Sequence, residues 1–285
     1  MVYQLNDVSV RYKDQTALEH INCTIEIGKW ISVIGQTGAG KSTFVKVLKG
    51  LIPTIEGEYL IHHQPASRDR RGKLQVVPEI GFVFQYPEHQ LYETTVEREL
   101  SFAMRLQGAP QAEIQDFIQV VLPQVGLSEE VLLLSPFQLS GGQKRKVALA
   151  AVLMSNPQVL IVDEPTAGLD PVSRTAMLQL LKGWQQQGER TVIFVSHQME
   201  DVAEYSDEVL VLHEGRLMGH FETAILFLER TELFDELGLL LPEPIQLLKF
   251  VEELSGHRIG LNSCREADIF ARLAPILAGK EHLYG

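Results

Sequence analysis

Hydrophobic and polar positions repeat with two different periods along the first 222 residues. Alternation in "YQLNDVSVRY" (3–12) predicts a strand, and "CTIEIGKWISVIG" (23–35) predicts two short strands around Gly28. Unbroken apolar runs predict three buried strands, at 80–85, 158–164 and 191–197. Helical spacing predicts helices within 35–52, 86–126 and 172–187. Buried strands that alternate with helices are typical of an α/β fold whose parallel sheet is covered on both faces.

The character of the chain changes near residue 222. A hairpin with Gly215 in its turn is expected over 207–221, and Leu-rich helices broken by "LPEP" (241–244) follow it. We therefore expect a small, mostly helical C-terminal domain over 223–285. Its helical stripe reads equally well as core or as a dimer contact, and comprises Ile245, Leu248, Val251 and Leu254. Ser263 and Glu266 have the spacing of a capping box at the start of the last helix.

Composition disfavours several classes of protein. A hydrophobic fraction of 45% with 22% charged residues is ordinary for a globular chain, and the net charge of −12 gives no support to a nucleic-acid partner. Cys23 and Cys264 are too few for a disulfide framework, no secretion signal is recognisable, and the cytosol is the expected compartment. No apolar run reaches the length of about 18 residues that a membrane span needs, so we expect any membrane link to come through a partner. His62 and His63 lack metal-ligand spacing and are expected at the surface.

The segment "GQTGAGKS" (35–42) matches the phosphate-loop pattern G-x-x-x-x-G-K-[ST]. Its glycines let successive N–H groups point at phosphate oxygens, and the helix that follows adds its positive N-terminal end. Lys41 could then reach the β- and γ-phosphates, and the Ser42 hydroxyl could ligate Mg²⁺. A plain Gly-rich turn is the alternative, and the strand before and helix after it favour the phosphate loop. The candidate nucleotide-binding residues here are Gly35, Gln36, Thr37, Gly38, Ala39, Gly40, Lys41, Ser42 and Thr43.

Two adjacent acids end the buried strand at 158–164. In such a sheet the carboxyl end of this strand lies beside the phosphate loop. Since neighbouring side chains on a strand point to opposite sides, Asp163 could hold Mg²⁺ through water while Glu164 orients and deprotonates the attacking water. Solvated turn acids are the alternative interpretation.

The pentapeptide "LSGGQ" (139–143) resembles the signature of ATP-binding cassette (ABC) ATPases. Ser140 can act as the N-cap, while Gly141 and Gly142 leave bare N–H groups that form a second anion site with the helix dipole. The resemblance implies a head-to-tail dimer, in which the signature of each protomer, Gln143 included, covers the γ-phosphate of the ATP on the other's phosphate loop. The alternative is a flexible loop before a core helix.

Other residues match the family's motifs in their usual order. The resemblance gives Tyr12 an adenine-stacking role, makes Gln85 the glutamine that senses Mg²⁺ and water, and brings His197 to the γ-phosphate. It also places Asp170 in the loop that signals across the dimer. Without the family context, Tyr12 would read as a strand-edge residue and His197 as structural. The implied fold over 1–222 is a P-loop ABC nucleotide-binding domain that binds ATP and Mg²⁺, with a mixed sheet core, an antiparallel β subdomain and an α-helical subdomain at about 86–150.

Longer stretches are similar to the ATPases of energy-coupling factor (ECF) transporters. "VFQYPEHQLYETTVERELSFA" (83–103) carries their pattern after Gln85, and "DEPTAGLDP" with an intact Glu164 resembles the second of their two ATPase types, although Tyr86 and Lys146 depart from the pattern and leave the subtype open. The resemblance implies an ATP-hydrolysing subunit that powers import of vitamins or transition-metal ions. Its implied partners are a second ATPase, identical or paralogous, a transmembrane coupling subunit and a substrate-capture membrane protein, at the cytoplasmic face of the cell membrane.

Three other classes remain open from the residues. They are the ATPase of another ABC importer or exporter, a soluble ABC protein outside transport, and a non-hydrolysing regulatory protein with a cassette fold. An acidic balance and a single cassette disfavour the second class, and the intact Lys41, Asp163, Glu164 and His197 disfavour the third.

Overall fold

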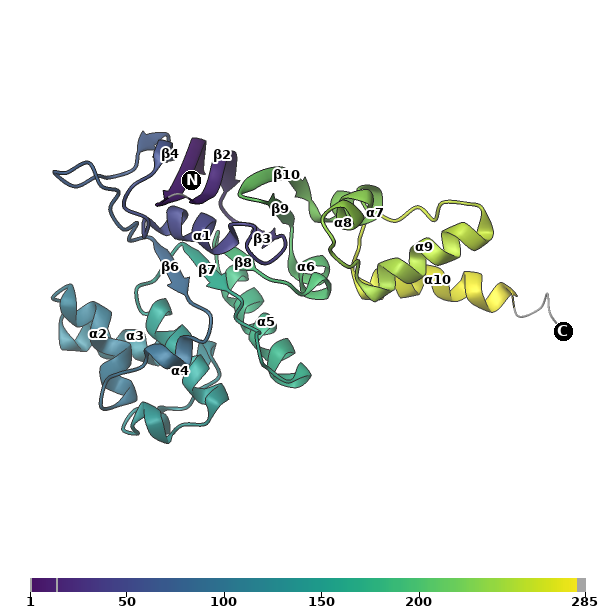
Figure 1. The fold of residues 1–285 in the computed structure, drawn as a ribbon. Coiled ribbons are helices and arrows are strands. Elements are labelled where there is room, and N and C mark those ends of the chain that lie inside the picture. The colour runs from purple at the N-terminus through teal and green to yellow at the C-terminus, as the bar shows by residue number, and fades with distance from the viewer. Residues whose placement is uncertain (1, 14, 281–285) are drawn as a thin grey trace.

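The computed structural model describes residues 2–13 and 15–280 and places two β-sheets on either side of helix α1 (Lys41–Lys49) (Figure 1). The first sheet is antiparallel, in the order β2-β1-β4-β5. Its strands are β1 (Val2–Tyr12), β2 (Gln15–Glu26), β4 (Glu56–Ile61) and β5 (Gln64–Pro65). The second sheet has the order β10-β9-β3-β8-β7-β6 and is parallel except for the hairpin of β9 with β10. Its strands are β3 (Trp30–Ile34), β6 (Ile80–Val83), β7 (Val159–Asp163), β8 (Thr191–Val195), β9 (Glu208–His213) and β10 (Arg216–Glu222).

The central strands divide their side chains between two cores. All residues of β3, β7 and β8 are buried. Ile161 and Ile193 face α1 and the antiparallel sheet, while Leu160 and Phe194 face the helices on the other side. Because successive side chains on a strand alternate, an unbroken apolar run is what a sheet covered on both faces requires. The predicted α/β architecture with a mixed sheet is confirmed.

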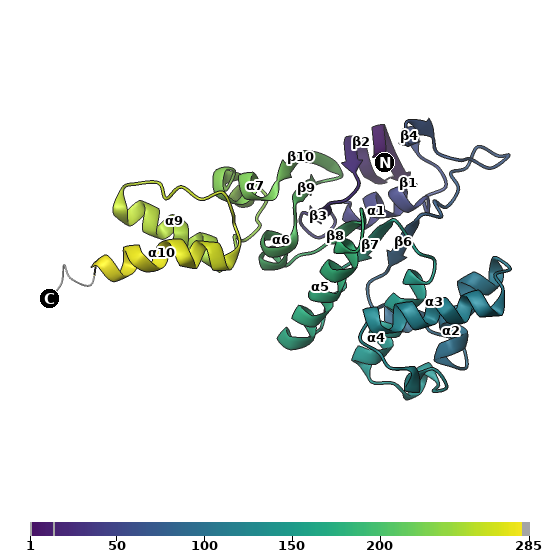
Figure 2. The ribbon, with the colours of Figure 1, turned by 180° about the vertical axis from the view of Figure 1, so that it is seen from behind.

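A helical subdomain is inserted between β6 and β7. It contains α2 (Val96–Leu106), α3 (Gln111–Gln124), α4 (Gly141–Leu153) and the short 3-10 helices η1 (Pro87–Gln90), η2 (Glu129–Val131) and η3 (Pro136–Gln138). These helices lie over the range predicted for the subdomain, and α4 continues slightly beyond it. Figures 1 and 2 show them on the opposite side of α1 from the antiparallel sheet.

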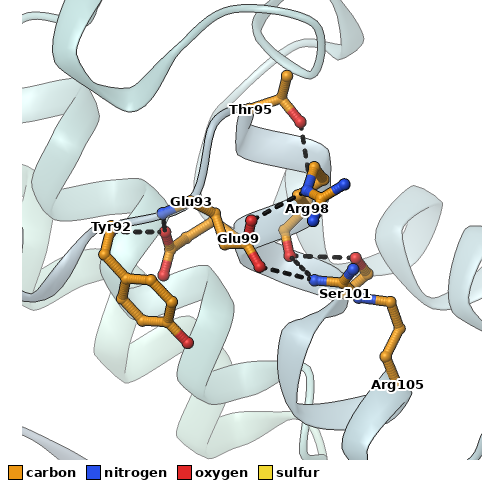
Figure 3. Close-up of polar contacts among 7 residues, drawn as sticks. All are labelled: Tyr92, Glu93, Thr95, Arg98, Glu99, Ser101 and Arg105. Carbon is orange, nitrogen blue, oxygen red and sulfur yellow. Dashed lines mark hydrogen bonds and ion pairs between the residues drawn. The ribbon is translucent and has the colours of Figure 1, made fainter.

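Polar contacts hold the chain where it enters α2 (Figure 3). The Thr95 hydroxyl oxygen caps the helix by accepting the N–H of Arg98. The buried Glu99 carboxylate accepts the backbone N–H groups of Tyr92 and Glu93, at 2.9 and 2.8 Å. Glu93 in turn pairs with Arg98 and Arg105, each at 2.9 Å. The approach to α2 is therefore tied to the helix itself.

Helices α5 (Pro171–Gln186) and α6 (Met199–Tyr205) lie beside the parallel sheet, and the last four helices extend away from the helical subdomain (Figures 1 and 2). These four are α7 (Thr223–Glu229), α8 (Glu232–Glu236), α9 (Glu243–Ser255) and α10 (Glu266–Lys280). The last strand ends at Glu222, so the expected start of the C-terminal domain coincides with the end of the sheet. The final part of the predicted domain, 281–285, lies outside the described residues.

The structure decides two questions about the C-terminal region, namely the role of the apolar stripe on α9 and the cap of α10. In the stripe on α9, Ile245, Leu248 and Val251 are buried in the chain's own core, while Leu254 is 64% exposed, so three of these four residues cannot form a dimer contact. The predicted capping box is wrong because α10 begins at Glu266 itself.

A contact from another helix replaces that box. The Ser263 hydroxyl oxygen accepts the N–H of Arg265, and its proton goes to the Asp268 carboxylate. The N–H of Glu266 is instead taken by Glu204 of α6, at 3.4 Å.

The two cysteines are thiols with raised pKa values, and the paired histidines lie in a turn. Burial raises the pKa of Cys23 to about 12 and that of Cys264 to about 11, so both thiols stay protonated at neutral pH. His62 and His63 form the turn between β4 and β5. Over the described residues no three His, Cys, Asp or Glu side chains are grouped as a metal site, and no helix there has the length and hydropathy to span a membrane.

Candidate nucleotide site

Two glycines of the loop between β3 and α1 are required by the fold itself. Gly35 has φ of 146°, and a Cβ there would lie 2.1 Å from the Leu212 carbonyl oxygen of β9. Gly40 precedes α1 with φ of 99°, and its Cβ would lie 2.7 Å from the Ala17 carbonyl oxygen of β2. Neighbouring strands therefore pack directly on the loop backbone, which leaves no room for a side chain at either position.

The Lys41 side chain lies inside the loop. Its Nζ donates to the carbonyl oxygens of Gly35 and Gln36, at 2.7 and 2.9 Å, and the residue is buried. Burial lowers the pKa of the Lys41 amine, and the carboxylates of Glu164 and Asp163 oppose that shift. A buried cation is thus held beside two acids and the loop carbonyls.

The loop opens on a cavity of about 460 Å³. Thr37, Gly38, Gly40, Lys41, Ser42 and Thr43 line it together with Glu164 and His197. Gly35 and the buried Ala39 lie behind the lining, and the amide end of Gln36 approaches Gly238, just after α8. Most of the predicted phosphate-binding residues therefore come together around one space.

Glu164 is held by two other predicted residues. Its Oε1 lies 2.8 Å from Nε2 of His197, and its Oε2 accepts a hydrogen bond of 2.8 Å from the Gln85 amide. Gln85 follows β6, Glu164 follows β7 and His197 follows β8, so three neighbouring parallel strands deliver these groups to one edge of the sheet.

The strand alternation used to separate the two acids does not extend to Glu164. β7 ends at Asp163, and Glu164 has φ of 51°, in the left-handed region. Both carboxylates consequently lie near Lys41 and influence its pKa. Burial raises the pKa of Asp163 itself, and the Ser42 side chain opposes the shift.

The signature segment lies apart from this cavity. The Ser140 hydroxyl oxygen caps α4 by accepting the N–H of Gln143, at 3.3 Å, and the Ser140 N–H donates to the Gln143 side chain, at 3.0 Å. The predicted N-cap is confirmed. A Cβ on Gly141 or Gly142 would meet nothing within 4 Å, and both residues are helical. A side chain at Gly35 or Gly40 would clash with a neighbouring strand, whereas the packing of the chain itself does not require glycine at positions 141 and 142.

Asp170 and Tyr12 also lie outside the phosphate cavity. Asp170 caps α5, and its Oδ1 accepts the N–H groups of Val172 and Ser173. A hydrogen bond from the Ser173 hydroxyl holds the pKa of Asp170 below its ordinary range. Leu169, just before it, lines a separate cavity of about 290 Å³ with Ser140, Gly142 and Gln143. Tyr12 is 48% exposed and pairs with Gln15, which borders the phosphate cavity.

Sequence reasoning missed the second wall of the cavity. Gln15, Thr16 and Ala17 of β2 line it, as do Glu214 and Gly215 in the β9–β10 turn. The Gly215 N–H donates to the Ala39 carbonyl, so this turn supports the phosphate loop. No local pattern marks these residues, because only the packing of distant segments brings them to the loop.

Comparisons with known proteins agree with this geometry. A family model described as "ABC transporter" matches residues 18–167. The energy-coupling factor transporter ATP-binding protein EcfA2 of Acetivibrio thermocellus is 40% identical over 240 residues, which cover 84% of each chain. The structure of cbiO1 from Clostridium perfringens, described as part of the transporter complex cbiONQ, has a TM-score of 0.73 at 32% identity and covers 87% of this chain and 98% of its own. A dimeric ATP-binding cassette bound to ADP and Pi in a post-hydrolysis state has a TM-score of 0.66 at 28% identity, over 78% of this chain and 99% of its own.

Proposed function

The chain belongs to the ABC transporter family, among the ATP-binding subunits of energy-coupling factor transporters, and from this premise we propose that it hydrolyses ATP between two subunits to power solute import. One observation carries the proposal. The phosphate loop shares one cavity with Glu164 and His197, whereas the signature glycines lie outside it with no packing role in their own chain. Each subunit therefore offers two half-sites that a head-to-tail pair completes.

The phosphate-loop half binds the nucleotide. Backbone N–H groups and the N-terminus of α1 receive the phosphates, and Lys41 exchanges the carbonyls of Gly35 and Gln36 for phosphate oxygens in stronger, charge-assisted bonds. Tyr12, exposed beside the cavity, stacks on the adenine ring.

Ser42, Asp163 and Gln85 would hold Mg²⁺, since hydroxyl, carboxylate and amide oxygens suit this ion, and Ser42 and Asp163 already interact. When bound, the ion neutralises charge on the phosphates.

Glu164 is the general base in this proposal. A water oxygen attacks the γ-phosphorus, the bond to the bridging oxygen of ADP breaks, and Glu164 accepts a proton from the water. Gln85 and His197 hold the two carboxylate oxygens and so set the direction in which the base faces. His197 contacts the γ-phosphate as well in this proposal, which is supported by its position at the cavity wall.

The signature half closes the site. Ser140, Gly141 and Gly142 present helix N–H groups to the γ-phosphate on the partner, and Gln143 holds the cap of that helix. Asp170 shapes the neighbouring turn at the start of α5.

Turnover is expected to depend on protein concentration. If ATP is cleaved only between two subunits, the rate per molecule of the purified chain falls on dilution below the dimer dissociation constant, in proportion to the fraction paired. Steady-state phosphate release over a dilution series, with light scattering at the same concentrations, measures both quantities. A constant rate per molecule in a strictly monomeric preparation would contradict the two-subunit site.

The solute class and the partners extend the proposal. We propose vitamins or transition-metal ions as the solutes, chosen by a separate substrate-capture membrane protein, and a working dimer with an identical or a paralogous ATPase. A transmembrane coupling subunit holds the pair at the cytoplasmic face of the membrane. A cavity of about 440 Å³ beside η1 and η3, with Phe137 at its edge and 69% exposed, supports docking at the surface that follows Gln85.

Phe137→Asp is therefore expected to abolish co-purification with the coupling subunit while the free chain keeps its ATP hydrolysis. A charge at an exposed apolar contact must be desolvated on docking, which disfavours the complex. Val76→Asp is the matched control, because Val76 is also exposed but lies near Gly50, after the end of α1, and does not line this cavity. Pull-down after co-expression with the neighbouring genes measures the effect. Equal recovery of both variants would remove η3 from the docking surface.

A further inference from the structure

The side chain of Arg145 connects two segments of the nucleotide site that belong to different sequence motifs. It lies in the second turn of α4, and its side chain is only 8% exposed. Nε and Nη2 donate to the two carboxylate oxygens of Glu88, at 3.1 and 2.9 Å. Nη1 donates to the carbonyl oxygens of Pro165 and Ala167, at 3.3 and 3.1 Å. One guanidinium thus binds η1 and the turn that follows Glu164, the proposed general base.

These two segments each carry one partner of the Gln85–Glu164 hydrogen bond. Glu88 follows Gln85 by three residues, and Pro165 follows Glu164 directly. The contacts therefore form a closed ring that runs from Gln85 through Glu88, Arg145 and Pro165 to Glu164 and back to Gln85.

The backbone inside this ring is strained at two points. Tyr86 and Glu164 have φ of 56° and 51°, a left-handed conformation that bulky side chains rarely adopt. Such conformations persist where the surrounding structure imposes them. Arg145 binds Glu88, two residues after Tyr86, and Pro165, directly after Glu164, so it is placed to maintain both conformations.

We propose that Arg145 is a positioning residue for ATP hydrolysis, which sets the spacing of Gln85 and Glu164 and ties it to the signature helix. This inference rests on the proposed function, because Arg145 acts only through Gln85 and Glu164. Gly141 and Arg145 stand on successive turns of α4. When the start of this helix shifts on binding the partner's nucleotide, Arg145 therefore moves as well, and with it the contacts that position Glu164 of the same chain.

The chemistry of the pair requires an arginine. A guanidinium binds a carboxylate through two parallel bonds and still has a third nitrogen for the carbonyls, whereas a lysine ammonium is a point charge. Burial raises the pKa of Glu88, but the hydrogen bonds and charge of Arg145, together with a backbone N–H and the neighbouring His89, outweigh it, so the pKa lies below its ordinary range. A lysine at position 145 keeps the positive charge but cannot form the two parallel bonds to the Glu88 carboxylate.

A second Arg–Glu pair in the same subdomain supplies the control. Arg105 donates to Glu93 at 2.9 Å and to the Arg98 carbonyl at 3.1 Å (Figure 3). The Arg105 side chain is 35% exposed. It makes no hydrogen bond to the turn after Glu164 or to α4.

The test compares Arg145→Lys, Glu88→Gln, their double variant and Arg105→Lys in the full-length chain. Phosphate release gives kcat and KM, fluorescent ATP gives the nucleotide affinity, and thermal melting reports folding. We expect each of the first two variants to lower kcat on the order of 10- to 100-fold, as a misplaced catalytic group does. Their ATP affinity should stay within about 3-fold, and the double variant should be no more than about 2-fold below the slower single variant, because both remove one connection. Arg105→Lys should stay within about 2-fold of the unsubstituted chain.

Three results would overturn the inference. They are a kcat for Arg145→Lys within about 2-fold of the unsubstituted chain, an equal loss in Arg105→Lys, or single losses that multiply in the double variant. Where Arg145→Lys loses its melting transition, Glu88→Gln decides, because that side chain keeps its shape. A Glu164→Gln variant distinguishes the two proposals. Normal turnover in that variant overturns the proposed function as well, whereas slow turnover there with normal turnover in Arg145→Lys overturns only the positioning role.

Discussion

Glu164→Gln is expected to slow ATP hydrolysis by roughly 10²- to 10⁴-fold, the contribution of a general base, while ATP still binds. Glutamine keeps the shape of the side chain and its contact with Gln85 but cannot accept the proton of the attacking water. It also removes a negative charge from the wall of the phosphate cavity, so ATP affinity should be unchanged or tighter. ATP-bound dimers should accumulate as a result, because closure proceeds and cleavage does not.

Single-turnover phosphate release and size-exclusion chromatography with ATP and Mg²⁺ measure these two effects. Glu200→Gln is the control, since it removes an exposed acid at the second position of α6 and lies outside the phosphate cavity. If Glu164→Gln turns over as fast as this control, the base must be another group. If it loses ATP binding instead, Glu164 supports the loop rather than the chemistry.

Gly142→Asp is expected to lower the rate of ATP hydrolysis without lowering the stability of the isolated chain. A Cβ at position 142 would meet nothing within 4 Å, and an acid in the first turn of a helix is stabilising by about 0.3–1 kcal/mol. The melting temperature of the isolated chain should therefore hold or rise. Turnover should fall on the order of 10²-fold or more, because the new carboxylate faces the partner's triphosphate and blocks donors that stabilise charge in the transition state.

Ala112→Asp places the same charge at the same helical position, the second residue of α3, and should leave turnover unchanged. A mixing experiment sharpens the test. Gly142→Asp and Lys41→Ala disable opposite half-sites, so an equal mixture of the two inactive variants should regain up to about a quarter of the normal activity, through mixed dimers with one intact site. No recovery, despite mixed dimers that form, would contradict the head-to-tail arrangement.

The sequence predicted those features that depend on neighbouring residues. Apolar runs located β6, β7 and β8 because a strand buried on both faces has no polar face to show. "GQTGAGKS" predicted the phosphate loop because only glycine tolerates the backbone conformation and the close approach found at Gly35 and Gly40. Ser140 was predicted as a cap because its hydroxyl reaches a backbone N–H within one helical turn.

Other features depend on groups that are distant in the sequence. The capping box at Ser263 was displaced by Glu204, which lies on another helix and satisfies the same kind of donor. Ile245, Leu248 and Val251 show the same spacing whether they face a partner or the chain's own core, and only the packing places them in the core. The alternation rule likewise stops at Asp163, because Glu164 adopts a left-handed conformation.

The sequence by itself determined which chemical groups this protein carries and on which local elements they stand. Periodicity, capping and turn geometry involve only a few consecutive residues, so these could be worked out along the chain. The tertiary structure alone decided that Glu164 meets both Gln85 and His197, that Arg145 braces this cluster, and that Gly141 and Gly142 face open space. The physical reason is that hydrogen bonds and close packing act over a few ångströms, and only the folded chain brings segments so far apart in sequence within that range.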